Sequence, residues 1–157
     1  MKTKLTILAL LFICPSLATI ASEKKEKGEK VDQTVAIAGN DMMKFDLATF
    51  EVKAGSKVKI TLTNTGKIPK IAMGHNFVLL KSGITAIAFG QKTLTSGAGP
   101  ANPLPDSVKG DVIAYTKLLG PGESDSIVFT APAAGEYEYV CTFPGHFALM
   151  RGKMVSK

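Results

Sequence analysis

The residues best suited to chemistry lie close together in the sequence YVCTFPGHFALMRGKM, residues 139–154. Cys141, His146 and Met150 offer a thiol, an imidazole and a thioether within ten positions. Thiolate and thioether sulfur select soft metals, and imidazole suits copper in either oxidation state. This loop therefore has the donor types of a soft-metal site, and its single cysteine needs an explanation.

Cys141 admits three interpretations. It is a small buried hydrophobe, as free cysteines often are, a nucleophile activated by His146, or a metal thiolate. In EYEYVC, the alternation places Tyr137, Tyr139 and Cys141 on one strand face, which we expect to point inward. A cysteine at the inner end of a strand suits packing or metal binding better than an open catalytic cleft. The sequence carries no signature of a thiol enzyme, so we predict that the protein is not an enzyme.

A second imidazole is available from His75 in AMGHNFVLL, the only other histidine of the sequence. Taken alone, a histidine at the start of an apolar strand is more often a hydrogen-bonded core residue than a ligand. Together with the loop, it completes two histidines, one cysteine and one weak axial methionine, which is the donor set of blue-copper sites. The residues favour copper binding over a plain packing role.

The N-terminal residues predict export. MKTK supplies positive charge, the apolar run LTILALLFICPSLA is short for a membrane span, and small residues precede a cleavage point after Ala21. We predict a signal peptide over residues 1–21, a periplasmic location, and no membrane insertion after cleavage. Cys14 falls in this segment, so Cys141 would be the only cysteine of the mature chain. Residues 22–30, SEKKEKGEK, predict a charged flexible tether.

Residues 31–157 are expected to form one domain. In KVKITLTNTG, Val58, Ile60 and Leu62 alternate with lysine and threonine, as in a strand with one buried face. Further short β-branched or aromatic runs, separated by glycine, proline and asparagine, predict an all-β sandwich or barrel. Residues 83–110 contain one possible short helix and a segment rich in proline and glycine. We expect this stretch to form a short helical or irregular flap outside the sheets.

The charge of the chain argues against one class of partner. The formal net charge is +6, the lysines are scattered, and there is no tryptophan. No aromatic residues are interleaved with arginine. We therefore predict no nucleic-acid partner.

Two stretches, MGHNFVLL and CTFPGHFALM, together resemble the azurins, the bacterial members of the cupredoxins. Four residues separate Cys141 from His146 and three separate His146 from Met150, which is the azurin spacing. AGNDMMKFD and VIAYTKLLGPGESDSIVF are also azurin-like, so the resemblance covers nearly all of residues 31–157. It implies the cupredoxin fold, a Greek-key β-sandwich, and one type 1 copper ion.

The same resemblance implies roles for individual residues. His75, Cys141 and His146 would be equatorial ligands, Met150 a long axial contact, and the backbone carbonyl of Gly74 would approach from the opposite side.

Around these ligands, Asn76 would tie the two ligand loops together. The apolar collar where partners dock would consist of Met73, Phe143, Pro144, Gly145 and Leu149.

The function implied is that of a monomeric periplasmic blue copper protein that shuttles single electrons between redox partner proteins. Such partners include c-type cytochromes or a copper-containing reductase. An extracytoplasmic copper carrier or storage protein with the same fold is the alternative, and a metal-free interaction sandwich is a further one.

Three features depart from the azurin pattern. The N-terminal disulfide has no cysteines here, and Phe77 stands where azurins carry a buried tryptophan. Asn64 aligns with a histidine that azurins often have near the copper. None of these positions is an expected ligand.

Overall fold

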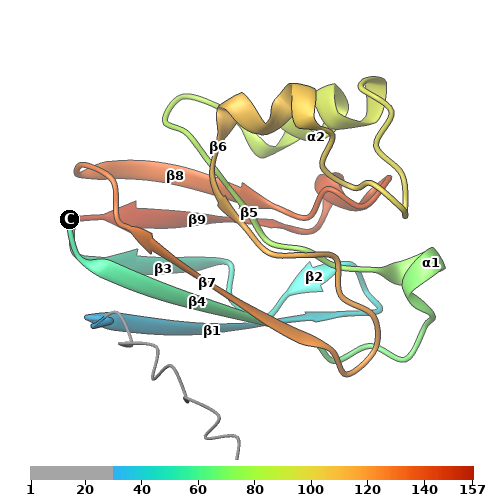
Figure 1. Ribbon diagram of the computed structural model, residues 1–157, viewed down its shortest axis with the longest axis horizontal. Helices are drawn as coiled ribbons and strands as arrows, with labels where there is room; N and C mark the ends of the chain where they lie inside the picture. Colours follow the sequence, from blue (N-terminus) through green and yellow to red (C-terminus); the bar gives the residue numbers. More distant parts are fainter. Residues whose placement is uncertain (1–29) are drawn as a thin grey trace, which may run out of the picture.

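The computed structural model describes residues 30–157, which form a β-sandwich with a helical flap on one side (Figure 1). The predicted signal peptide, residues 1–21, lies outside the described residues, as does the predicted tether except for Lys30. The strands are β1 (Gln33–Asn40), β2 (Lys44–Phe45), β3 (Thr49–Val52), β4 (Lys57–Asn64), β5 (Val78–Leu80), β6 (Val112–Tyr115), β7 (Ser124–Thr130), β8 (Gly135–Val140) and β9 (Arg151–Ser156). The helical segments are α1 (Lys70–Met73), α2 (Ala86–Thr95) and the 3-10 turns η1 (Asp106–Asp111) and η2 (His146–Ala148). None of the helices in the described part of the chain has the length and apolar character that crossing a bilayer requires.

The strands form two sheets, with orders β2-β1-β4-β7 and β3-β9-β8-β5-β6. β1 lies parallel to β4 and β3 lies parallel to β9, whereas the other pairs are antiparallel. Strands far apart in the sequence are therefore neighbours, and the two sheets pack face to face instead of closing into a barrel (Figure 1). The predicted all-β, Greek-key β-sandwich is confirmed.

β4 shows how the sequence pattern becomes a buried face. Val58, Ile60 and Leu62 are fully buried, while the lysines and threonines between them are half-exposed. This alternation was the clearest strand signal of the sequence, and it is confirmed. The three side chains belong to the main core, the buried cluster between the sheets that also contains Leu79 and Tyr139.

β5 and the end of β8 at Val140 are covered on both faces, because the flap packs on the outer side of their sheet (Figure 1). Leu79 and Tyr139 face the main core. A second cluster, called the flap core below, fills the space under α2 and consists of Val78, Leu80, Ala86, Phe89, Leu104, Val108 and Val140. This double burial explains why the sequence around β5 reads as an unbroken apolar run.

The flap corresponds to the predicted irregular region, residues 83–110. It contains α2, which begins at the expected short helical segment, and most of η1. The side chain of Thr85 caps α2 by accepting a hydrogen bond from the Ala88 amide, at 3.3 Å. The prediction of a short helical flap outside the sandwich is confirmed.

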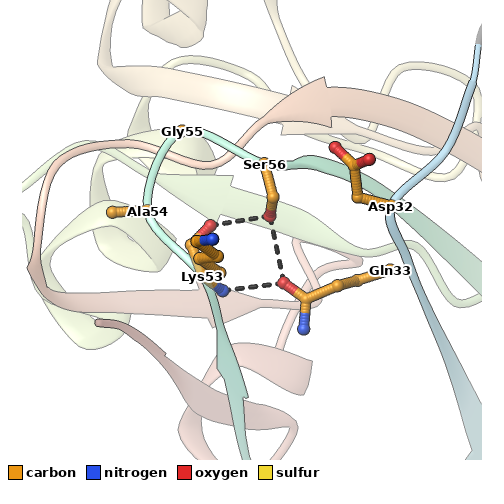
Figure 2. Close-up of a pocket in the computed structure, with 6 residues that line it drawn as sticks. All are labelled: Asp32, Gln33, Lys53, Ala54, Gly55 and Ser56. Carbon is orange, nitrogen blue, oxygen red and sulfur yellow. Dashed lines mark hydrogen bonds between the residues drawn. The ribbon is translucent and has the colours of Figure 1, made fainter.

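One end of the sandwich, opposite α1, is closed by the turn between β3 and β4 (Figure 1). Figure 2 shows the shallow pocket at this turn, where the Gln33 side-chain oxygen accepts bonds from the Lys53 amide, at 2.7 Å, and the Ser56 hydroxyl, at 3.0 Å. The Ser56 hydroxyl also lies 2.6 Å from the Lys53 carbonyl. Asp32 accepts the Lys57 amide at 2.9 Å. These polar groups close the turn. The predicted ligand residues lie at the other end of the sandwich.

Candidate metal centre

Three of the predicted ligands meet in the interior. The ligand atoms of His75, Cys141 and His146 all lie within 4.8 Å of one another. The Cys141 Sγ atom is 3.6 Å from Nδ1 of His146, and the two histidine rings have centroids 5.2 Å apart. These three residues and Met150 are all buried. Side chains that are 66 positions apart in the sequence thus form one compact donor group.

The loop from Cys141 to Met150 is closed by its own backbone. The Cys141 amide donates to the Met150 carbonyl at 2.9 Å, and the Met150 amide donates to the His146 carbonyl at 2.8 Å. The His146 amide donates to the Phe143 carbonyl at 3.0 Å. Gly145 has a φ of 84° at this turn, a left-handed conformation that favours glycine. The spacing of the motif is therefore the spacing of a tight turn that brings three donors together.

His75 is held by a backbone pair with Leu119. The His75 amide donates to the Leu119 carbonyl at 3.0 Å, and the Leu119 amide donates back to the His75 carbonyl at 2.7 Å. The Asn64 side chain, buried at the end of β4, also donates to the Leu119 carbonyl, at 3.1 Å. Asn64 thus supports the backbone partner of His75, a contact that the sequence did not reveal.

Both ring nitrogens of His75 are buried without a hydrogen-bond partner among the described residues. Burial lowers the pKa of His75, opposed by the nearby Asn40 carbonyl, the Asp41 carboxylate and the Gly74 carbonyl. The carbonyls face the ring, but neither makes a hydrogen bond of ordinary geometry with it. An unsatisfied buried polar group is unfavourable. A metal ion would bind the free lone pair of this neutral, buried imidazole.

Cys141 and His146 are also held in their neutral forms. Burial raises the pKa of the Cys141 thiol to about 11, against the effect of the backbone amides of Asn76 and Phe143. Burial, and then the proximity of His75, lowers the pKa of His146 to about 4. A fully buried thiol beside a neutral imidazole is a poor nucleophile. A bound cation, by contrast, displaces the thiol proton and makes the thiolate the stable form.

Met150 lies over Gly39, a residue of β1 in the opposite sheet. A Cβ atom added at Gly39 would lie 2.6 Å from the Met150 Cε atom and 3.1 Å from Cδ2 of His75. Only glycine leaves room there for both the thioether and the imidazole. A glycine inside a strand often marks such a close approach.

Asn76 joins the two ligand loops by a reciprocal pair of hydrogen bonds. Its side-chain amide donates to the Thr142 hydroxyl, and its oxygen accepts the Thr142 amide, each at 2.9 Å. The Gly74 carbonyl oxygen lies 4.0 Å from the Cys141 Sγ atom. A Cβ atom at Gly74 would lie 2.8 Å from the Leu118 side chain and from the Lys70 carbonyl. The expected Gly74 carbonyl therefore faces the donor group, and a side chain there would clash.

The residues expected to form a docking collar differ in how exposed they are to solvent. Leu149 is 57 % exposed, Gly145 is exposed, and Met73 and Pro144 are partly buried. Phe143 is buried beneath them, with its ring centroid 4.5 Å from that of His146. The sequence did not single out Ile71 of α1, which is 71 % exposed.

The departures from the azurin pattern are accommodated without disturbing the donor group. Phe77 is fully buried in the main core, with its ring centroid 4.9 Å from Tyr139 and 6.4 Å from Phe45. Cys141 is a free cysteine in the described residues. The aromatic residues of the main core are therefore all phenylalanine and tyrosine.

Known proteins are similar to this chain in sequence and in fold. The model of the copper-binding plastocyanin/azurin family matches residues 31–157. Azurin-1 of Alcaligenes xylosoxydans xylosoxydans is 44 % identical over 125 residues, covering 76 % of this chain and 93 % of that protein. The azurin of Bordetella pertussis is 42 % identical over 125 residues, covering 77 % and 81 %.

Solved structures agree with the sequence comparison. Auracyanin A, a blue copper protein of Chloroflexus aurantiacus, superposes with a TM-score of 0.68 at 36 % identity and covers 79 % of this chain and 98 % of its own. An azurin of Methylomonas sp. strain J superposes with a TM-score of 0.69 at 29 % identity, covering 81 % and 99 %. The buried donor group fits one type 1 copper ion, and the chain belongs to the plastocyanin/azurin family of copper-binding proteins.

Proposed function

We propose that the protein is a periplasmic electron carrier that binds one copper ion. His75, Cys141 and His146 would be the equatorial ligands, with Met150 as the axial ligand and the Gly74 carbonyl opposite. The observation that carries the proposal is the buried group of donors, whose ligand atoms lie within 4.8 Å of one another. Bound copper supplies one-electron oxidation and reduction. Because side chains of the protein fill the site, it is suited to electron transfer more than to binding a substrate.

The surrounding residues favour fast electron transfer by limiting rearrangement. The Asn76–Thr142 pair fixes the distance between the two ligand loops, and the closed backbone turn fixes His146 relative to Met150. Such outer contacts orient ligands before the metal arrives. A site that changes little between oxidation states loses little energy to reorganisation.

We propose that partners dock over His146, at the collar formed by Met73, Phe143, Pro144, Gly145 and Leu149. The exposed side chain of Leu149 supports this, because a contact there brings a partner close to the buried His146 ring. Redox proteins such as c-type cytochromes or a copper-containing reductase would be the partners, and the carrier would act as a monomer. We propose no enzymatic activity.

The test begins with the visible spectrum of the copper-loaded protein. We expect an intense blue band from charge transfer between the Cys141 sulfur and copper(II). The Cys141→Ser variant should bind copper without that band, and zinc-loaded wild type should be colourless, since zinc has no redox chemistry. A colourless copper(II) wild type would exclude the blue-copper site.

A second measurement separates electron carriage from copper carriage or storage. The complete burial of His75 and Cys141 favours a metal that stays in place. We expect slow loss of copper to a chelator, together with rapid reversible reduction by a small-molecule donor. Rapid exchange of copper with the chelator would support the carrier or storage function instead.

A further inference from the structure

The loop that carries His146 is anchored in both cores of the protein. Cys141, Phe143 and Met150 belong to the main core. Phe147, the residue directly after His146, packs instead against the flap core. The short turn η2 therefore bridges the sandwich and the flap, with His146 between the two anchors.

Phe147 packs directly against Gly90, a glycine of the flap helix α2. A Cβ atom added at Gly90 would lie 2.1 Å from Cγ, 2.4 Å from Cβ and 2.6 Å from Cδ2 of Phe147. The contact with Cβ cannot be relieved by rotating the ring, so either the loop or the helix would have to move. Gly90 is buried inside α2, where glycine is disfavoured relative to alanine. Its backbone is not left-handed, so the close approach of Phe147 is what requires glycine here.

The flap helix is itself firmly held, so it can act as a fixed support. A side-chain oxygen of Glu138, from β8, accepts the Ala86 amide at the start of α2, at 2.7 Å. Phe89 is buried in the flap core. Lys92 forms an ion pair with Asp111 at 2.6 Å near the other end of the helix.

From this geometry we propose that Phe147, seated against Gly90, is a positioning residue that holds His146 in place for the metal. The inference rests on the proposed copper site but concerns a contact outside the donor group. The backbone bonds of the loop fix His146 relative to Met150, and the Phe147 contact fixes that turn relative to the sheet that carries Cys141. The flap is then part of the metal site's support.

The experiment compares variants of this contact with matched controls. Phe147→Ala removes the anchor, Phe147→Leu keeps an apolar one, and Gly90→Ala displaces it. Gly110→Ala makes the same chemical change in the flap, where an added Cβ meets nothing within 4 Å. Val108→Ala removes buried apolar volume from the flap core but leaves Phe147 and Gly90 unchanged. Copper loss to a chelator, the visible spectrum and the urea midpoint are measured for each.

We expect Phe147→Ala and Gly90→Ala to lose copper about tenfold faster or more, as loss of outer support typically does, and to alter the relative intensities of the visible bands. Phe147→Leu and Gly110→Ala should remain near wild type. Val108→Ala should lower the urea midpoint without changing copper loss or the spectrum. If Val108→Ala loosens copper as much as Phe147→Ala does, the effect is general softening and the proposal is wrong. It is equally wrong if Gly90→Ala matches Gly110→Ala.

A readout on the metal-free protein keeps this test independent of the copper proposal. Backbone amide exchange, followed by NMR, should accelerate between residues 146 and 150 in Gly90→Ala and in Phe147→Ala. It should not accelerate there in Gly110→Ala. Unchanged exchange in both contact variants would overturn the positioning role, whereas absence of copper binding by wild type would overturn the proposed function alone.

Discussion

Without copper, the two buried histidines should make the protein less stable as the pH falls below neutrality. Burial lowers the pKa of His75, and it lowers the pKa of His146 to about 4. In the unfolded chain both would have the ordinary value near 6.5. Between these pH values the unfolded chain binds protons that the folded protein excludes. The free energy of unfolding is therefore intact above about pH 6.5 and decreases as the pH falls toward the folded pKa.

The size of the effect follows from the His146 shift. Well below pH 6.5, each excluded proton removes about 1.4 kcal/mol of stability per pH unit. From pH 6.5 to pH 5 this amounts to an upper limit of about 2 kcal/mol for one histidine. The exposed neighbours Gly145 and Leu149 let water approach the ring and weaken the effect, so we expect about 1–2 kcal/mol for His146. His75 adds to this in the same direction.

The assay is urea unfolding in the presence of a chelator at pH 7, 6 and 5, followed by circular dichroism. The control is the double variant His75→Gln, His146→Gln, which cannot titrate in this range. The carboxyl groups of Asp106 and Glu123, whose pKa values are lowered by Lys109 and by the Gly120 amide respectively, act with the same sign. They do so only below their ordinary range, near pH 4, and fall outside the window.

The expected result is a wild-type free energy of unfolding that falls between pH 7 and pH 5 while that of the double variant stays nearly level. Parallel curves for the two proteins would refute the reasoning, because the histidines would then be protonated equally in the folded and unfolded states. A wild-type stability that rises on acidification would also refute it, since the sign depends only on the direction of the pKa shifts.

Other predictions concern the copper protein. Leu149→Glu should slow electron self-exchange, measured by NMR line broadening, and leave the visible spectrum unchanged. Leu94→Glu, on the exposed side of α2, should change neither the exchange rate nor the spectrum; equal rates in the two variants would move the docking site elsewhere. The reduction potential should be nearly flat between pH 5 and pH 8 by voltammetry, because both histidines would be ligands; a slope near one proton per electron would mean that His146 leaves copper(I). Gly39→Ala should push the Met150 thioether away from copper and raise the potential, because a weaker axial donor stabilises copper(II) less; an unchanged potential would show that the added methyl is absorbed elsewhere.

Much of the sandwich was predictable because its strands carry local signals. The alternation in β4 arises because one strand face is buried and the other is exposed to water. Val58, Ile60 and Leu62 show this pattern in the sequence itself. The ligand loop was predictable for a similar reason, since Cys141, His146 and Met150 lie within one turn. His75 was different, because its role depends on a partner 66 positions away.

What the sequence could not reveal are contacts made only by the tertiary fold. The short helix α1, of four residues, has too few positions for a periodic pattern. Gly39 leaves room for Met150, and Gly90 leaves room for Phe147. Each contact joins elements that are distant in the sequence, so no local sequence pattern indicates that they meet. The same is true of Asn64, which continues the buried face of β4 and reaches the backbone partner of His75.

Because His75 and Cys141 are far apart in the sequence, a bound metal would also stabilise the fold by closing a long loop. An ion that joins them closes a 66-residue loop, as a cross-link would. In the chain-entropy treatment used for disulfides, a loop of that length stabilises the fold by about 4 kcal/mol relative to an open unfolded chain. Copper that remained on the unfolded loop through Cys141, His146 and Met150 alone would forgo most of this gain. In a domain whose described residues contain a single cysteine, the metal would thus also act as a cross-link between the segment before β5 and the loop after β8.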